Sequence, residues 1–337
     1  MSVKARGKVI LNLEIYKTII ASTVRYANAT IPEKDWAEVY GLLYGYVQND
    51  NAIITAAVPF THTQKVKRIL KVEFSEQDYV DAAEIETEMM VEDPPKYIMG
   101  WYHSHPGIKV MLSQDDVRTQ LSWQEQNPHA IALVFNHKQL LDQVELPARK
   151  GDPVKPLKDD LGFRIYRLDN PSKGLEAQYH EVPFEFSDLK VDSTLVKNAQ
   201  EFVGYVTKAF PRGDEYVLQA DKFVSEQSNK VGQLLVGTVS YVQTLLKQGN
   251  SERVASVLDM QRGEIQKAID FGNEKTSLYQ MLLPYVEYKE RADMIPKIQE
   301  ILARWTKKVT EIGEIFEKLQ KDPPSVTLES ITQNSPQ

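Results

Sequence analysis

Two short stretches organise this chain: GWYHSHPG at residues 100–107 and SQDD at residues 113–116. The first places His103 and His105 two residues apart, and the second supplies Asp116 eleven residues after His105. Residues two apart on a β-strand point to the same face of a sheet. Two imidazoles and one carboxylate give a metal ion three protein ligands and leave a fourth position open, which is typical of a catalytic zinc site.

The first stretch is predicted to be part of a strand over residues 97–105, in which Met99, Trp101, His103 and His105 share one face. A single histidine on a strand is more often a half-buried polar residue than a metal ligand. Two histidines on one face, followed by an acid at the start of the next element, favour metal binding over that plainer interpretation.

The second stretch has a purely structural explanation as well. Ser113 and Asp116 have the spacing of a capping box, in which a serine and an acid three residues later satisfy the first N–H groups of a helix. The apolar pattern predicts such a helix over residues 114–126. The same spacing recurs at Ser75 and Asp78, so it indicates no chemistry by itself.

Glu38 is the only charge in a predicted strand over residues 37–47, whose sequence is AEVYGLLYGYV. A carboxylate is costly to bury unless it is paired or used. Two interpretations stay open: an edge-strand carboxylate that faces water, or a general base that takes a proton from a water and passes it to a leaving nitrogen. Gly41 and Gly45 are expected to allow close approach of another backbone.

The composition limits the classes of function. With 337 residues, 42% hydrophobic and 26% charged, the chain is expected to form two soluble domains. The absence of cysteine excludes disulfides, thiolate ligands and cysteine nucleophiles. A net charge of −7 with scattered basic residues indicates no nucleic-acid partner, and residues 65–71 hold only a short basic cluster. No signal peptide or membrane span is indicated, so we expect a cytoplasmic protein.

The hydrophobic pattern changes near residue 186. Before that point it predicts an α/β (α+β) domain, a mixed sheet flanked by helices. Residues 187–321 carry apolar stripes at three and four spacing, which predict an all-α extension that closes on itself or docks to a partner. Residues 136–162 are expected to be an unpacked insertion, and residues 322–337 a disordered tail. The predicted strands are 9–13, 37–47, 52–58, 69–74, 97–105, 130–135, 163–168 and 178–183, and the predicted helices are 14–27, 75–91 and 114–126.

Glu38, His103, His105, Ser113 and Asp116 together resemble the signature Glu…His-x-His-Pro-x6-Ser-x-x-Asp of the JAMM (MPN+) metallopeptidases. The flanking words EVYGLLYG and GWYHSHPG are similar to those of deubiquitinating members, above all the proteasome-lid and signalosome subunits. The resemblance spans about residues 8–185.

The resemblance implies an MPN (cytidine-deaminase-like) fold for residues 1–186. It implies that His103, His105 and Asp116 bind Zn²⁺, and that Glu38 acts as general base and then as general acid. It further implies that the Ser113 hydroxyl helps to hold the tetrahedral oxyanion. The implied reaction is hydrolysis of the isopeptide bond between ubiquitin, or a ubiquitin-like protein, and a lysine side chain.

The resemblance also suggests where substrate and partners bind. An extended C-terminal tail of the modifier is expected to add as a strand near residues 65–95, 107–112 and 136–162. The helices of residues 187–321 are expected to dock to an MPN partner or a proteasome-type assembly. Three other functions stay open: a non-catalytic MPN scaffold, a JAMM hydrolase acting on a sulfur carrier or small molecule, and an iron oxygenase with two histidines and a carboxylate.

The sequence departs from these relatives at two places. After His105-Pro106, residues 107–113 read GIKVMLS and lack the cysteine and tryptophan of the relatives' Gly-[Tyr/Phe]-Gly-Cys-Trp-Leu-Ser. Residues 136–137 are Asn-His where the relatives tend to carry Asp-Pro. The remaining histidines are expected to be surface or structural residues: His62, His129, His137 and His180.

Overall fold

The computed structural model describes residues 7–60, 75–147 and 153–329. The chain divides into two compact units. The first unit comprises Met1–Arg212 together with Tyr285–Lys289, and the second comprises Gly213–Pro284 and Glu290–Gln337. The change of hydrophobic pattern near residue 186 coincides with the end of the last strand, whereas the division into units lies at residue 212, after one further helix.

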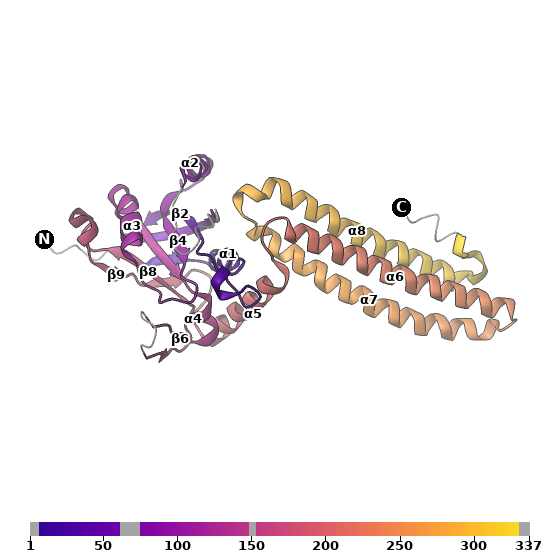
Figure 1. Ribbon diagram of the computed structural model, residues 1–337. Coiled ribbons are helices and arrows are strands. Elements are labelled where there is room, and N and C mark those ends of the chain that lie inside the picture. The colour runs from indigo at the N-terminus through magenta and orange to yellow at the C-terminus, as the bar shows by residue number, and fades with distance from the viewer. Residues whose placement is uncertain (1–6, 61–74, 148–152, 330–337) are drawn as a thin grey trace. The chain divides into compact units, whose positions relative to one another are not determined.

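An eight-stranded mixed sheet forms the core of the described part of the first unit, in the order β10-β1-β3-β2-β4-β5-β8-β9 (Figure 1). Strands β1–β10, β1–β3 and β4–β5 pair in parallel, and the other neighbours are antiparallel. The strands are β1 (Val9–Leu11), β2 (Tyr40–Gln48), β3 (Asn51–Pro59), β4 (Tyr97–Ser104), β5 (Ile131–Phe135), β8 (Phe163–Leu168), β9 (Tyr179–Glu181) and β10 (Phe184–Phe186), and β6 (Val144–Glu145) and β7 (Lys155–Pro156) form a separate pair. This confirms the predicted mixed sheet flanked by helices.

Helices cover both faces of the sheet. The helices of this unit are α1 (Leu13–Val24), α2 (Glu76–Met90), α3 (Gln114–Gln126), α4 (His137–Asp142) and α5 (Ser193–Ala209). On one face, Ile85 of α2 and Leu121 of α3 share a buried cluster with Trp101 of β4. On the other face, the ring of Tyr16 in α1 packs against aromatic rings of β5, β8 and β10. Both faces of the central strands are therefore buried, which explains their nearly continuous apolar sequence.

A tight hairpin turn lies between the second and third strands. Asn49 and Asp50 join β2 to β3 with φ angles of 50° and 66°, which is the left-handed geometry of a tight hairpin turn. Close backbone approach is confirmed at Gly45, where a Cβ atom would lie 1.8 Å from the Ile53 carbonyl oxygen.

Strand β4 contains a bulge that the sequence does not predict. Gly100 pairs with Leu43 and Ile98 pairs with Tyr44, so Met99 has no partner in the ladder with β2. Gly100 has φ of +138°, and a Cβ atom there would lie 2.0 Å from the Ile131 carbonyl oxygen. The prediction that Met99 shares the face of Trp101 is wrong in consequence, because Ile98 packs against the Trp101 cluster instead.

The predicted strand over residues 37–47 begins later than expected. Strand β2 starts at Tyr40, so Glu38 lies before the strand and not within it. The predicted strand over residues 69–74 lies outside the described residues, as does the basic cluster at 65–71.

Residues 136–162 are not simply an unpacked insertion. Asn136 caps helix α4, which buries His137 and Leu140, and Gln143 accepts the Asp160 N–H at 2.9 Å. Part of the expected disordered tail is ordered too. Pro323–Ser325 form a 3-10 helix, and the carbonyl of buried Val326 accepts a hydrogen bond from Gln243 at 2.7 Å.

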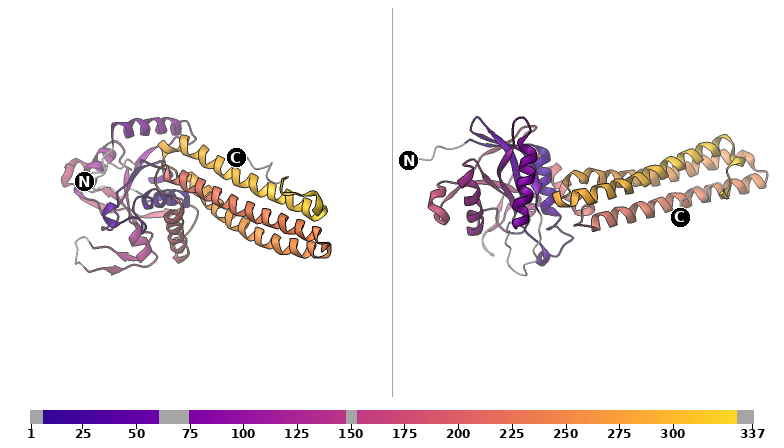
Figure 2. Two further views of the ribbon diagram at one scale, coloured as in Figure 1. Left: turned by 45° about the vertical axis from the view of Figure 1, so that its right-hand side comes forward. Right: turned by 90° about the horizontal axis from the view of Figure 1, so that it is seen from above.

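The second unit consists mainly of α6 (Glu215–Lys247), α7 (Val254–Leu282) and most of α8 (Tyr288–Lys321), which run side by side (Figure 2). The Trp305 indole of α8 donates to Asn273 of α7 at 2.9 Å, and a Cβ atom on Gly272 would lie 2.0 Å from the same indole. Gln227 of α6 donates to the Ala268 carbonyl of α7 at 2.6 Å. The apolar stripes are therefore buried against one another within this unit, confirming the all-α extension.

The segment Tyr285–Lys289 belongs to the first unit although it joins two helices of the second. Glu287 accepts hydrogen bonds from Arg25 at 3.1 Å and from the Tyr26 hydroxyl at 2.6 Å. Lys289 forms an ion pair with Asp81 at 2.8 Å. Among the described residues, no helix combines the length and apolarity needed to cross a membrane.

Candidate metal centre

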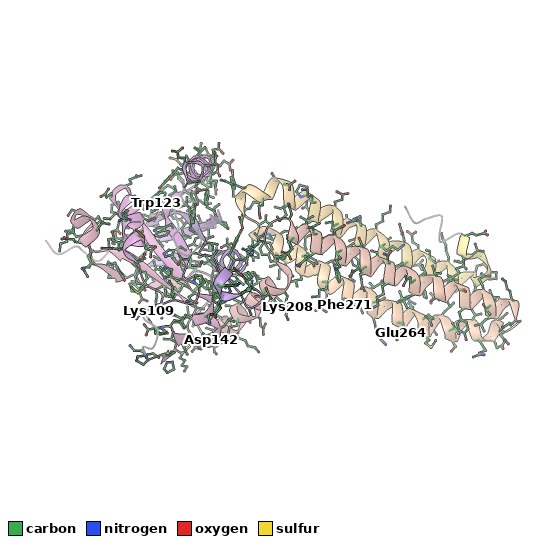
Figure 3. The ribbon with its side chains drawn as sticks, in the orientation of Figure 1. Lys109, Trp123, Asp142, Lys208, Glu264 and Phe271 are labelled. Atoms are coloured by element: carbon green, nitrogen blue, oxygen red, sulfur yellow. The ribbon has the colours of Figure 1, made fainter. Side chains whose placement is uncertain are left out.

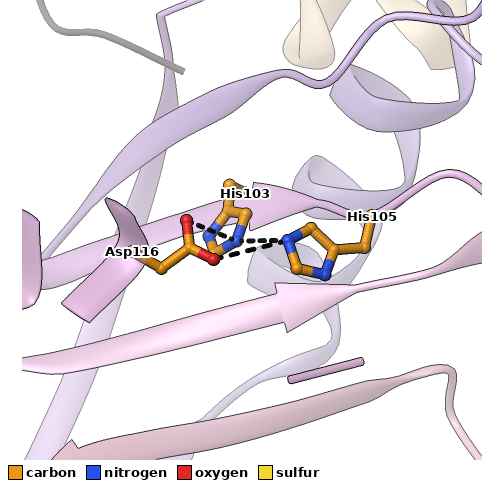
Figure 4. A group of neighbouring side chains, drawn as sticks. All are labelled: His103, His105 and Asp116. Atoms are coloured by element: carbon orange, nitrogen blue, oxygen red, sulfur yellow. Dashed lines mark hydrogen bonds and ion pairs between the residues drawn. The ribbon is translucent and has the colours of Figure 1, made fainter. Parts of the chain in front are cut away.

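His103, His105 and Asp116 bring their ligand atoms together at the carboxyl end of β4 and the first turn of α3 (Figure 4). The two Nε2 atoms are 3.1 Å apart. Asp116 Oδ1 lies 3.4 Å from His103 Nε2, and Asp116 Oδ2 lies 3.5 Å from His105 Nε2. All three residues are buried, so these donors face one another with little access for bulk water.

The spacing of these donors fits a tetrahedral metal ion. Zinc bonds of about 2.0–2.2 Å at tetrahedral angles place neighbouring ligand atoms about 3.3–3.6 Å apart. The observed separations of 3.1, 3.4 and 3.5 Å are close to those edges. Two imidazole nitrogens that point at each other need a shared cation or proton, which makes the arrangement suited to a metal.

The surroundings of the histidines prepare them for such a role. His105 Nδ1 donates to the Lys109 carbonyl at 2.9 Å, which leaves the Nε2 lone pair for a ligand. The His103 ring is stacked on Trp101 at 4.4 Å, and the Trp101 indole N–H is held by Gln120 at 3.0 Å. Both imidazoles thus have fixed orientations.

The electrostatics keep the carboxylate charged. Burial alone would raise the pKa of Asp116, but His103, His105 and the Ser113 side chain outweigh burial and hold that pKa well below its usual range. Burial lowers the pKa of His103, which favours the neutral imidazole that a metal requires.

Glu38 lies close enough to this cluster for the charges of His105 and Asp116 to act on its pKa. Burial is the main cause that raises the pKa of Glu38 to about 7; the charge of His105 opposes this rise and the charge of Asp116 adds to it. The backbone next to Glu38 is tied to β4, because the Val39 N–H donates to the Ser104 hydroxyl at 3.0 Å and the Ser104 N–H donates to the Val39 carbonyl at 2.9 Å. The pairing of Tyr40 with His103 continues this connection.

Comparison with known proteins agrees with this geometry. Residues 8–129 match the sequence family described as JAB1/Mov34/MPN/PAD-1 ubiquitin protease. Residues 8–129 therefore carry the sequence features of the JAB/MPN family, and we refer to them as the JAB/MPN domain. The match includes Glu38, the His-x-His pair and Asp116.

Curated relatives of this JAB/MPN domain are similar over part of their length. The Lys-63-specific deubiquitinase BRCC36 of Camponotus floridanus is 37% identical over 100 residues, which cover 29% of this chain and 39% of the relative. The 26S proteasome regulatory subunit rpn11 of Schizosaccharomyces pombe is 35% identical over 78 residues, which cover 23% of this chain and 20% of the relative. COP9 signalosome complex subunit 5 of Kluyveromyces lactis is 29% identical over 171 residues, which cover 49% of this chain and 42% of the relative. The matched segments span less than half of each relative.

Ser113 of the JAB/MPN domain is the N-cap of α3 and completes the predicted capping box. Its hydroxyl accepts the Asp116 N–H at 3.2 Å, and its own N–H donates to Asp116 Oδ2 at 2.7 Å. This cap orients the Asp116 carboxylate toward the histidines. The Ser113 side chain also interacts with the Asp116 carboxylate and lowers its pKa.

The other described histidines do not join the metal cluster. His137 is buried against the Trp36 ring at 5.0 Å, and burial lowers its pKa to about 4. His129 lies 3.6 Å from Asp50, and His180 is hydrogen-bonded to Asp169 at 2.6 Å. His62 lies outside the described residues.

Sequence reasoning missed three parts of this site: Ser104, Gln120 and the Lys109 carbonyl. Ser104 lies between the two candidate ligands His103 and His105, so its position in the motif is plain. Its hydrogen bond to Val39 depends on how the segment before β2 lies against β4, which the sequence does not reveal. A backbone carbonyl has no sequence signature at all. Gln120 was detectable only as a polar residue on the buried side of α3.

The regions expected to contact substrate surround this site only in part. Residues 61–74 are outside the described part of the chain, and residues 75–90 include α2 with its Ser75 cap. Lys109, in the loop after His105, forms an ion pair with Glu145 of β6 at 2.7 Å (Figure 3). The loop and the β6–β7 hairpin are therefore neighbours.

Proposed function

We propose that the JAB/MPN domain is a zinc-dependent isopeptidase that removes ubiquitin or a ubiquitin-like protein from lysine side chains. The observation that carries this proposal is the convergence of two imidazoles and a carboxylate, two of which act through their charges on the pKa of Glu38. The relatives named as a ubiquitin protease family and as a Lys-63-specific deubiquitinase support the substrate class.

The residues divide the work as follows. His103, His105 and Asp116 would hold zinc with a fourth position free, and zinc there would supply Lewis acidity toward water and the scissile carbonyl. Glu38, with a pKa near 7, accepts a proton from the attacking water and returns it to the leaving amine. A group with this pKa exchanges protons readily in both directions at neutral pH.

Ser113 supplies a hydrogen bond to the oxyanion of the tetrahedral intermediate. Ser113 lies at the N-terminus of α3, where the helix dipole favours negative charge. In this role its hydroxyl proton points to the oxyanion, while a lone pair of the same hydroxyl continues to accept the Asp116 N–H.

The modifier's C-terminal tail binds between α2, the loop of residues 107–112 and the insertion of residues 136–162. Deletion of residues 144–158 tests this placement and keeps Gln143, which anchors the base of the insertion. A raised KM for diubiquitin is expected. Unchanged KM and kcat would exclude a role for the insertion.

The helical unit docks to an MPN partner or a larger assembly in the cytoplasm. Two of the relatives are named as subunits of the proteasome and the COP9 signalosome. The exposed apolar side chains that such docking would cover are Leu218, Val236, Tyr241, Met260, Phe271 and Met281. Phe271 is labelled in Figure 3. The solution mass of the purified chain tests self-association. A mass of 38.5 kDa is that of a single chain, so it would exclude self-association and leave other proteins as the docking partners.

Metal removal tests the proposed reaction. The purified chain should cleave lysine-linked diubiquitin, lose that activity in a chelator, and regain it when zinc is added back. Magnesium added in place of zinc is the control, because it prefers oxygen ligands and should not restore cleavage. Full activity in excess chelator would contradict a zinc mechanism.

A further inference from the structure

The loop between β4 and α3 is held by three hydrogen bonds to three consecutive backbone carbonyls. Asn136 Nδ2 donates to the Ile108 carbonyl at 2.6 Å. His105 Nδ1 donates to the Lys109 carbonyl at 2.9 Å, and the Tyr166 hydroxyl donates to the Val110 carbonyl at 2.8 Å. The Lys109 carbonyl, which orients His105, therefore lies between the Ile108 and Val110 carbonyls, and these two accept hydrogen bonds from other side chains.

Both flanking donors are rigidly placed. Asn136 is 1% exposed and directly follows β5, and Tyr166 is 7% exposed in β8. Asn136 Oδ1 accepts the Lys138 N–H at 2.9 Å as the cap of α4, which turns the NH₂ group of the same carboxamide toward Ile108. The loop is therefore fastened to the sheet and not to its own residues alone.

We propose that Asn136 and Tyr166 are positioning residues for the metal ligand His105. By holding the carbonyls of residues 108 and 110, they keep the Lys109 carbonyl where it accepts the Nδ1–H of His105. This bond selects the tautomer that presents Nε2 to a metal. The inference rests on the proposed metal centre. It assigns the position of the Lys109 carbonyl to Asn136 and Tyr166, neither of which is a proposed metal ligand.

The chain offers a matched control in the same loop. The Tyr179 hydroxyl donates to the Leu112 carbonyl at 3.3 Å from strand β9. Tyr179→Phe removes the same kind of bond as Tyr166→Phe, but three residues away from Lys109. A general loss of loop rigidity would affect both variants, whereas misplacement of the Lys109 carbonyl is confined to Tyr166→Phe and Asn136→Asp.

The test compares these three variants in the full chain. Asn136→Asp keeps the acceptor that caps α4 and removes the donor to Ile108, and Tyr166→Phe removes a donor without changing charge. Zinc affinity is measured by competition with a chelating dye, and the geometry of the site by the visible spectrum of the cobalt(II) form. Unfolding temperature and circular dichroism confirm that each variant folds.

We expect zinc to bind about 3- to 10-fold more weakly to Asn136→Asp and to Tyr166→Phe, the size expected for losing one hydrogen bond. Their cobalt spectra should change, and Tyr179→Phe should match the wild type in both measurements. Unchanged affinity in Asn136→Asp and Tyr166→Phe would overturn the inference, and so would equal weakening in Tyr179→Phe. If Asn136→Asp does not fold, Tyr166→Phe alone decides the outcome.

These readouts separate the inference from the proposed function. Metal affinity and cobalt spectra need no substrate, so a chain that binds zinc without cleaving diubiquitin would refute the isopeptidase while the affinity differences still support the positioning role. A wild-type chain that binds no zinc would overturn both.

Discussion

The three clustered side chains of the JAB/MPN domain are oriented by groups that are not themselves proposed ligands, and the backbone beside Glu38 is held as well. Trp101 stacks on His103, the Lys109 carbonyl holds His105, the Ser113 N–H holds Asp116, and Ser104 ties down the backbone beside Glu38. Reactive groups that are held before substrate arrives need little reorganisation during the reaction. The site is therefore preorganised by ordinary elements of the fold.

The three clustered residues were predictable because local rules place them. Strand alternation puts His103 and His105 on one face, and a capping box puts Asp116 at the start of a helix. The nearness of Glu38 follows from the pairing of β2 with β4, which no spacing reveals, so only the family resemblance implied it. Its expected place inside a strand was wrong, since β2 begins at Tyr40.

The pH dependence should report the protonation of Glu38. A base must be deprotonated to act, so kcat/KM should rise with pH and level off once Glu38 is ionised. Its pKa is raised to about 7, mainly by burial, and a bound cation would favour the carboxylate, so the midpoint should lie at or below about 7. A rate profile of diubiquitin cleavage from pH 5 to pH 9 measures it, and activity that falls through this range would contradict the assignment.

Ser113→Ala should impair both folding and catalysis. Loss of the cap should cost about 0.5–2 kcal/mol of stability, and loss of one oxyanion donor should lower kcat by about 10²–10³. Ser75→Ala is the matched control, because Ser75 makes the same capping box at α2. Steady-state kinetics and thermal unfolding of both variants separate the roles, and equal kcat values would leave Ser113 as a cap only.

At the scale of elements, local signals predicted more than long-range pairing did. Helix α3 spans Gln114–Gln126 as predicted, because its cap, its apolar stripe and its end all depend on residues that are close together in the sequence. The bulge at Met99 was not predictable, since it depends on Gly100 meeting the Ile131 backbone of another strand. Helix α4 was hidden by its short length and by the polar residues around it.

Glu287→Gln should destabilise the first unit strongly. The Arg25 and Glu287 side chains are 0% and 8% exposed, and the substitution removes the carboxylate that pairs with the buried Arg25 charge. A loss of about 3–5 kcal/mol is expected for such a pair. The measurement is the unfolding of the full chain in denaturant, followed by circular dichroism.

Glu185→Gln is the control for that substitution. Glu185 pairs with Lys8 at the surface, where the side chains are 47% and 40% exposed, so about 0–1 kcal/mol should be lost. Similar losses in the two variants would contradict a structural role for the buried pair.

At the scale of the whole molecule, the sequence predicted an all-α region but not its relation to the first unit. The stripes at three and four spacing identify helices that bury one face, and they cannot say which residues belong to which unit. Tyr285–Lys289 joins the first unit through charged partners just after α1 and on α2, including Arg25 and Asp81. Such contacts connect residues more than 200 positions apart and leave no periodic pattern.

The central claim is that Glu38 acts on a water at a zinc site built by His103, His105 and Asp116. The most direct measurement is zinc content and diubiquitin cleavage of Glu38→Gln, with His103→Ala as the reference that lacks a ligand. Glu38→Gln should bind one zinc per chain and lose cleavage, because the carboxamide cannot accept the proton, while His103→Ala should lose both. Cleavage at the wild-type rate by Glu38→Gln would contradict the account.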